Sequence, residues 1–189
     1  MKRGIRIAAA ASGPIRGRKR TLLVIAVYRE GILEGVLSTN IGVDSSDSSK
    51  RIVSLIGRSR FKGQIKLIAL NGIALAGLNI VDVNTIKKAL KLNFVVLTRK
   101  KPHKKLLIDA IDKRKRAAEV ATDKEAVRKI RIVETVGKLK IVKSAGFYIQ
   151  SDLDIGKENK GLVKTTFEAL RIAHIIANGI ETGESKGRI

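Results

Sequence analysis

The sequence contains no cysteine and no tryptophan, and only two histidines occur among its 189 residues. The absence of cysteine excludes disulfides, thiolate-bound metals and a cysteine nucleophile. Two histidines also disfavour a histidine-based zinc site. Aromatic residues are limited to four phenylalanines and two tyrosines, and none is interleaved with the basic clusters. This pattern argues against recognition of single-stranded nucleic acid by base stacking.

Acidic residues are also scarce: Asp and Glu total 17 against 39 Lys and Arg, a formal net charge of +22. That charge is well beyond what solubility requires. A thermophilic surface would raise Glu together with Lys, a membrane-surface protein would carry its basic residues along one amphipathic helix, and a ribosomal protein would carry them in disordered tails. Here the basic residues are mixed through segments of apolar periodicity. We therefore expect a nucleic-acid partner.

Long apolar runs are missing as well, and none reaches the length of a transmembrane helix. The N-terminal segment MKRGIRIAAAAS becomes basic again at Arg16, so it lacks the sustained apolar stretch of a secretory signal. A chain of this length is enough for one domain with a sizeable core. We expect a single cytoplasmic domain over residues 1–189 with no membrane partner.

Apolar runs bounded by turn residues predict the strands. The first three follow one another through short turns, which indicates an antiparallel meander, and the last two are separated by a helix, which indicates a parallel crossover. A further hairpin is predicted within 130–150, around Gly137 and Gly146. The predicted strands cover residues 5–11, 21–28, 32–41, 65–70 and 94–98.

Helices are predicted from a Ser46 or Asp47 cap to about Ser59, over 83–90 and over 162–177. Another helix begins after Pro102, with an apolar stripe at Leu106, Ala110, Ala117 and Ala121. Residues 178–189 are polar and read as a tail. This order predicts an α/β, RNase H-like mixed sheet, in which three antiparallel strands are followed by parallel strands with helices on both faces. Nucleases of this fold hydrolyse phosphodiesters with two metals held by carboxylates at adjacent strand ends.

Several segments, in order along the chain, resemble the archaeal endonuclease dU family, which is distantly related to endonuclease V. The resemblance covers most of the chain and is weakest near 118–160. It implies an endonuclease V-like fold, DNA binding, a Mg²⁺ or Mn²⁺ cofactor, and repair of DNA by hydrolysis at deoxyuridine, a deaminated base. The segments are GPI at 13–15, VDSSDSSKRI at 43–52, QIKLIALNGIALAGLNIVDV at 64–83, VVLTRKKP at 95–102 and RIAHIIANGIETGESKGR at 171–188.

The chain departs from the family where the metal ligands are implied. The family reads Gly-Ile-Asp-Asp-Gly-Pro in its first strand and Leu-Asp-Gly-Ile after its fourth. Here Ala11 and Ser12 replace the first two acids, and Asn71 replaces the third. Asn71 still offers a carbonyl oxygen, but it brings no negative charge to a divalent ion. The substitutions predict a degenerate site and a possible pseudoenzyme.

The surviving acids Asp44, Asp47 and Asp82, together with Asn71, are the candidate catalytic residues, and Asp44, Asp47 and Glu184 are candidate metal ligands. Each has a structural alternative except Asp44, whose position no helix cap explains. Asp47 can cap the first helix, and Asp82 can cap the second. Glu184 can pair with Lys186 or Arg188.

Two basic clusters are the candidate nucleic-acid contacts, with Lys113–Arg116 beside them. Charge runs are often only solvated surface, but their number in one short chain favours phosphate binding. His174 lies on the apolar stripe of the last helix, which favours a buried structural role over a catalytic one. Gly72 and Gly77 bound a turn that allows either close approach to a ligand or a tight strand-to-helix connection. The clusters consist of Arg16, Arg18, Lys19 and Arg20, and of Arg99, Lys100, Lys101, Lys104 and Lys105.

The sequence supports two hypotheses. In one, the chain is a nuclease-derived protein that binds nucleic acid through phosphate contacts and has lost its metal. In the alternative, it is an active endonuclease, dependent on Mg²⁺ or Mn²⁺, that cleaves DNA at deoxyuridine. A third possibility is a subunit whose partner supplies the missing acids, although nothing in the sequence points to one.

Overall fold

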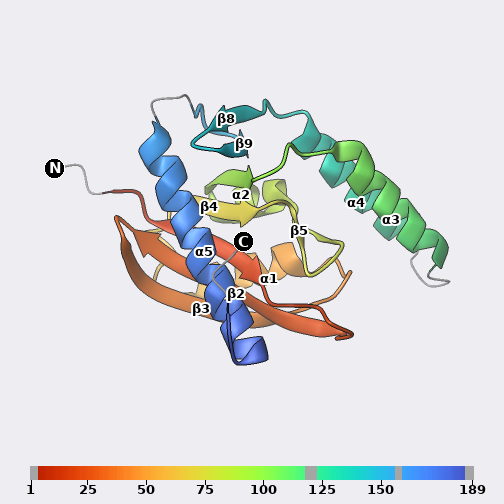
Figure 1. Ribbon diagram of the computed structural model, residues 1–189, viewed down its shortest axis with the longest axis horizontal. Coiled ribbons are helices and arrows are strands. Elements are labelled where there is room, and N and C mark those ends of the chain that lie inside the picture. The colour runs from red at the N-terminus through yellow and green to blue at the C-terminus, as the bar shows by residue number, and fades with distance from the viewer. Residues whose placement is uncertain (1–3, 118–122, 156–158, 186–189) are drawn as a thin grey trace.

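A computed structural model describes residues 4–117, 123–155 and 159–185. A seven-stranded sheet in the order β3-β2-β1-β4-β7-β9-β8 forms its centre, and a two-stranded sheet, β5-β6, lies beside it (Figure 1). The strands of the large sheet are β1 Ile7–Ser12, β2 Arg20–Arg29, β3 Ile32–Gly42, β4 Leu67–Asn71, β7 Asn93–Thr98, β8 Val142–Ser144 and β9 Phe147–Ser151. The small sheet consists of β5 Ala74–Leu75 and β6 Asn79–Ile80. The helices are α1 Ser48–Arg58, α2 Val83–Leu90, α3 Lys104–Ala117, α4 Asp123–Gly137 and α5 Lys160–Thr182.

The sheet is mixed, as the sequence predicts. Strands β1, β2 and β3 form an antiparallel meander, whereas β1, β4 and β7 run parallel to one another. Strands β9 and β8 then extend the sheet as an antiparallel hairpin. Because β1, β4 and β7 are parallel, their carboxyl ends meet at one edge, hereafter the carboxyl edge.

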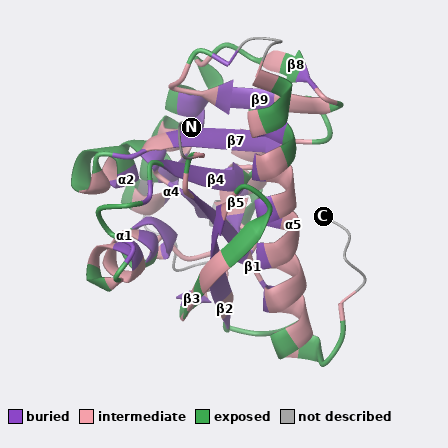
Figure 2. Ribbon diagram, turned by 90° about the vertical axis from the view of Figure 1, so that its left-hand side faces the viewer, coloured by how far each residue is buried: buried purple, intermediate pink, exposed green. Residues whose placement is uncertain are grey.

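Helices cover the two faces of the sheet unequally. Helices α1 to α4 contribute to the apolar cluster on one face, and α5 alone packs on the other (Figures 1 and 2). Figure 2 shows the buried strands between α1 and α2 on one side and α5 on the other. None of the helices in the described part of the chain is long and apolar enough to cross a membrane.

Small side chains let α5 approach β1 closely. Ala9 in β1 and Ala169, Ala173 and Ala177 in α5 are fully buried in the same cluster. At Gly13, directly after β1, an added Cβ would lie 3.2 Å from the backbone oxygen of Ala177. Interiors are close-packed, so larger residues here would push the helix off the sheet.

Two sequence predictions need correction. Residues 130–137 belong to α4 rather than to a strand, and only the part of the predicted hairpin at 142–151 forms β8 and β9. The β-branched residues of this segment favour strands, but buried Ala126, Val133 and Val136 share one helical face, and packing of that face decides the structure. Helix α3 ends at Ala117, and the predicted stripe position Ala121 lies outside the described residues.

The second correction concerns the C-terminal segment predicted as a tail from residue 178. Helix α5 continues to Thr182 and ends at Gly183, which has a φ of 79°. A left-handed residue of this kind commonly ends a helix, and glycine adopts it without a steric penalty. The helix passes through Gly179 because buried Ala177 and the contacts of Glu181 hold its last turns against the sheet.

Candidate nucleic-acid interface

The positions at which the family resemblance places acids lie together at the carboxyl edge. Ala10 of β1 pairs with Leu70 of β4, so the next residues along the two strands, Ala11 and Asn71, are neighbours. Asn71 in turn pairs with Leu97 of β7. Ala11 is buried at 6% exposure, whereas Asn71 is exposed. The predicted convergence is therefore present, but a methyl group and an amide occupy it.

The β5–β6 hairpin covers the end of β1. The Ala76 amide donates a hydrogen bond to Ser12 Oγ at 3.0 Å, and the Ala76 carbonyl accepts one from the Asp44 amide at 2.9 Å. Gly77 has a φ of 79°, and a Cβ at this position would collide with the Asp44 carboxylate. Gly77 therefore allows the β5–β6 hairpin to lie close to Asp44.

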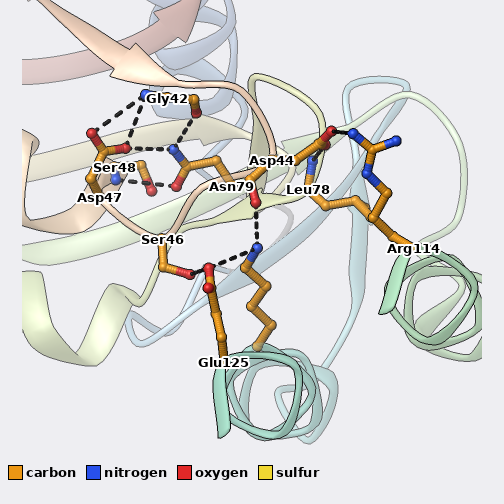
Figure 3. A network of polar contacts seen from close by, with 10 residues as sticks. Gly42, Asp44, Ser46, Asp47, Ser48, Leu78, Asn79, Arg114 and Glu125 are labelled. Atoms are coloured by element: carbon orange, nitrogen blue, oxygen red, sulfur yellow. Dashed lines mark hydrogen bonds and ion pairs between the residues drawn. The ribbon is translucent and has the colours of Figure 1, made fainter. Parts of the chain in front are cut away.

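Asp44 is held by contacts from three other segments of the chain (Figure 3). Its Oδ1 accepts a hydrogen bond from the Leu78 amide at 2.8 Å, and its Oδ2 lies 2.8 Å from a terminal guanidinium nitrogen of Arg114. Its backbone oxygen accepts a hydrogen bond from Lys129 Nζ at 2.6 Å. Its φ of 56° places the backbone in the left-handed region, which aspartate tolerates better than most residues. Both carboxylate oxygens therefore already have cationic or amide partners.

Asp47 precedes α1, but its side chain makes no capping bond to that helix. Its Oδ1 instead accepts hydrogen bonds from Asn79 Nδ2 at 2.8 Å and from the Gly42 amide at 3.2 Å. Asn79 is fully buried, and its side-chain oxygen accepts a hydrogen bond from the Ser48 amide at 3.1 Å. Asn79, rather than Asp47, therefore pairs with a free backbone amide at the start of α1. Sequence reasoning missed Asn79; its only signal is an amide within an otherwise apolar run.

Residues of α4 complete this polar network (Figure 3). Lys129 is a buried cation at 8% exposure, and its Nζ lies 3.3 Å from Glu125 Oε1. Ser46 Oγ donates a hydrogen bond to Glu125 Oε1 at 2.5 Å, and this bond, aided by the positive charge of Lys129, lowers the pKa of Glu125. No pattern in the sequence pointed to Lys129. Arg114, expected among the phosphate contacts, pairs with Asp44 instead.

The remaining acidic candidates lie apart from Asp44 and Asp47. Asp82 is the cap of α2: its Oδ1 accepts hydrogen bonds from the amides of Asn84 and Thr85. Glu184 is exposed beyond the end of α5, and its predicted partners, Lys186 and Arg188, lie outside the described residues. His174 is half-buried on α5, and burial lowers its pKa.

These residues do not fit a divalent cation. Mg²⁺ and Mn²⁺ require several carboxylate or carbonyl oxygens with room for water. The carboxylates of Asp44 and Asp47 are engaged by protein donors, and Asp82 caps a helix. Over the residues that the structure describes, no group of three or more His, Cys, Asp or Glu is placed to hold a metal ion.

The first basic cluster lies in the loop after β1. Arg16 and Lys19 are exposed there and make no ion pair with the described part of the chain. Arg18 is instead ion-paired with Glu181 of α5 and donates a hydrogen bond to its backbone oxygen at 3.0 Å. Arg20 donates to the Asn40 carbonyl at 3.1 Å. Two of the four candidates are thus fully available to a ligand.

The second basic cluster follows β7 at the same edge. The guanidinium of Arg99 lies over the ring of Phe167, 5.4 Å from its centroid, and this contact orients it beside the edge. The remaining four members of this cluster are exposed and make no ion pair with described residues: Lys100, Lys101, Lys104 and Lys105.

A cavity of about 570 Å³ lies between the carboxyl edge and the α3–α4 pair. Its interior is mostly apolar, with Val96, Leu107 and Val136 among the lining residues, and Asn71 and Gly72 line it at the edge. Lysines of the second basic cluster also line it: Lys100, Lys101 and Lys104. Such a volume is typical of a small-molecule site.

The fold is that of an RNase H-like protein. Human ENDOV, an endonuclease V, superposes with a TM-score of 0.53 at 14% identity, over 92% of this chain and 83% of that one. A family model described as Endonuclease dU matches residues 3–181. The chain belongs to the endonuclease dU family.

Relatives extend this assignment. A UPF0215 protein of Archaeoglobus fulgidus is 35% identical over 176 residues, covering 90% of this chain and 91% of the relative. A UPF0215 protein of Methanothermobacter thermautotrophicus is 33% identical over 197 residues, covering 99% and 93%. The crystal structure of a protein of unknown function from Archaeoglobus fulgidus superposes with a TM-score of 0.77 at 30% identity, over 93% of this chain and 98% of that one.

Proposed function

We propose that this chain is a nuclease-derived protein that binds nucleic acid, DNA in particular, through phosphate contacts at the carboxyl edge. The observation that carries this proposal is the position of the two basic clusters. They follow β1 and β7, the strands on either side of β4, so they flank Asn71 from both sides. A nucleic-acid backbone bound by both clusters would cross the carboxyl edge, where the family resemblance places the acids.

Electrostatics supports this orientation. Asp44 is paired with Arg114, and Asp47 accepts a hydrogen bond from Asn79 and lies 3.6 Å from Arg51. These contacts reduce the repulsion between the two acids near the edge and a polyanion. Arg16, Lys19 and the four lysines of the second basic cluster make no ion pair with the described part of the chain. A surface of this kind raises the local concentration of a polyanion and speeds its association.

The cavity supports a role with an altered or deaminated base. An unpaired nucleobase leaves a duplex at a cost of a few kcal/mol, and the cost is least for a mismatched or damaged base. The apolar interior of the cavity would accept the faces of such a base, while Lys100, Lys101 and Lys104 at the edge would contact its phosphates. We infer that deoxyuridine-containing DNA is the preferred ligand.

The test compares a labelled duplex containing one deoxyuridine with an unmodified duplex, for binding and for nicking. We expect retarded but uncut DNA, an affinity that falls with a log–log salt slope of several units, and no effect of Mg²⁺ or Mn²⁺ beyond screening. Absence of binding at low salt, or a salt-independent affinity, would contradict the proposal.

Family membership favours one alternative, an active Mg²⁺- or Mn²⁺-dependent endonuclease that cleaves DNA at deoxyuridine. It would have to use the surviving acids Asp44, Asp47, Asp82 and Glu184 with the Asn71 carbonyl. In that case Asp44→Ala would abolish metal-dependent nicking at the lesion. Lesion-specific nicking by the wild-type protein, lost in chelator and in Asp44→Ala, would establish this alternative over the proposal above.

A further inference from the structure

A second basic concavity lies between α1 and β3. It encloses about 290 Å³, and it is lined by Leu37 and Thr39 of β3 and by Arg51, Ser54, Leu55 and Arg58 of α1. Strand β3 is the edge strand of the large sheet, so no further strand covers this groove. We define these six residues as the α1–β3 groove.

One face of α1 supplies both guanidinium groups. Arg51, Ser54 and Arg58 are spaced by three and four residues, which places them on one side of the helix. Seven residues of helix span about 10 Å, and two arginine side chains can converge over that distance on one group. Helix α1 contains no Asp or Glu, so its own residues do not neutralise these charges.

Only one of the two guanidinium groups has an acid beside it. Asp47 Oδ2 lies 3.6 Å from Arg51 Nε, in a long ion pair, and Asp47 also accepts hydrogen bonds from Asn79 and Gly42. Arg58 makes no ion pair with any residue that the structure describes. Within the same part of the chain, the hydroxyls of Ser54 and Thr39 make no hydrogen bond.

Helix stability accounts for only part of this arrangement, through the i,i+4 pair of Arg51 with Asp47. A cation in the last turn, such as Arg58, interacts favourably with the helix dipole, but Arg51 lies near the positive N-terminal end of α1, where a cation is unfavourable. Two guanidinium groups that face one concavity also repel each other unless an anion lies between them. Their forked donors, with two hydroxyls beside them, match the oxygens of a phosphate group.

We propose that the α1–β3 groove is an anion site that takes a phosphate group, supplied either by the backbone of a bound nucleic acid or as free phosphate. The nucleic-acid source rests on the proposed function. Arg51 lies about one helical turn after Asp47, and Arg58 lies about two turns further along α1. A bound duplex that reached both surfaces would contact phosphates at the edge and in the groove.

The experiment has two arms. In the first, inorganic phosphate is titrated at constant ionic strength, and the Nε–Hε NMR signals of the arginines are followed. We expect the signals of Arg51 and Arg58 to shift together and to saturate, while that of Arg131, exposed on α4, does not. Equal shifts for all three arginines, or none for Arg51 and Arg58, would overturn the site.

The second arm measures the salt dependence of duplex DNA binding for R51A/R58A. The matched control is K88A/K164A, which removes the same charge from exposed positions on α2 and α5. We expect the log–log slope to fall by about two units in R51A/R58A and by much less in the control, because each lost phosphate contact removes about 0.9. That result identifies the nucleic-acid backbone as the source of the phosphate.

An unchanged DNA slope with saturable phosphate shifts would support the site with free phosphate as its ligand. If the wild-type protein binds no DNA, the proposed function fails, and the phosphate titration alone decides the groove. Should R51A/R58A fail to fold, R51Q/R58Q replaces it in the DNA arm, because glutamine also removes both charges and the same fall in slope is expected.

Discussion

The acidic loop between β3 and α1 and the basic loops after β1 and β7 lie at the same edge of the sheet, but their charges are treated in opposite ways. Asp44 and Asp47 are bound by amides and by Arg114 from elsewhere in the chain. Arg16, Lys19 and most of the second basic cluster remain without acidic partners in the described structure. The difference indicates that the acids belong to the framework, whereas the cations are accessible to an external ligand.

The strongest test of the framework role is Asn79→Ala. Asn79 bonds Gly42, Asp47 and Ser48 from a fully buried position, so its loss leaves several buried polar groups unpaired. We expect the free energy of unfolding to fall by about 3 kcal/mol, measured by urea denaturation. Asn84→Ala, at an exposed position on α2, is the control and should change it by less than about 0.5 kcal/mol. Equal effects of the two changes would contradict the framework role.

Substitutions in the basic loops should lower the affinity for duplex DNA and leave the free energy of unfolding nearly unchanged. The variant R16A/K19A/K100A/K101A removes four exposed cations from the two loops. We expect the log–log salt slope of duplex binding to fall by roughly three units and affinity at low salt to fall about a hundredfold. Arg18→Ala is the contrasting variant from the same loop, because Arg18 is paired with Glu181. It should leave the slope nearly unchanged, and a slope reduced as much as for an exposed cation would show that the pair opens on binding.

Acids introduced where the family resemblance places metal ligands test whether this edge can bind a metal ion. In S12D/N71D, two carboxylates would stand at the carboxyl ends of β1 and β4. A ligand that binds only the folded state raises the melting temperature, so Mn²⁺ should raise that of S12D/N71D by several degrees. The wild-type melting temperature should not change. A wild-type rise with Mn²⁺ equal to that of the variant would show that the surviving acids already bind the ion.

The smallest expected effect concerns the pH dependence of the network. The Ser46 hydrogen bond lowers the pKa of Glu125 from its ordinary value of 4.5, so the unfolded state binds the proton more readily. The stabilisation is therefore complete above the unfolded pKa and is lost as the pH falls through the lower, folded value. We expect Glu125→Gln to reduce stability at pH 7 and to differ less from the wild type below about pH 4, in urea titrations at each pH. Glu134→Gln, exposed on the same helix, is the control; a difference between wild type and E125Q that grew on acidification would contradict this account.

The parts of the fold that follow local patterns could be predicted from the sequence. Helix α2 matches its predicted bounds because Asp82 caps an amphipathic stretch, and β4 and β7 follow continuous apolar runs. The roles of Asn79 and Lys129 could not be predicted, because their partners lie far away in sequence. Lys129 bonds a residue 85 positions before it, and no local spacing encodes such a contact.

Among the site residues too, local patterns could be predicted from the sequence and long-range contacts could not. The convergence of Ala11 with Asn71 follows from parallel strand order, which the sequence predicts. The neutralisation of Asp44 depends on where α3 places Arg114, and that placement comes from tertiary packing. The sequence could therefore identify the candidate acids, but not that other residues of the chain pair with them.

The alanine-rich packing of β1 against α5 limits how the edge could change over evolutionary time. With Ala11 nearly enclosed beside a closely packed helix, a carboxylate regained at this position would be a buried charge, which costs several kcal/mol until a cation is also bound. A variant with a single acid at this position would therefore be less stable than the present protein. With α5 packed on these small side chains, a change from acids to Ala11 and Ser12, which the family resemblance implies, is a step that single substitutions would not readily reverse.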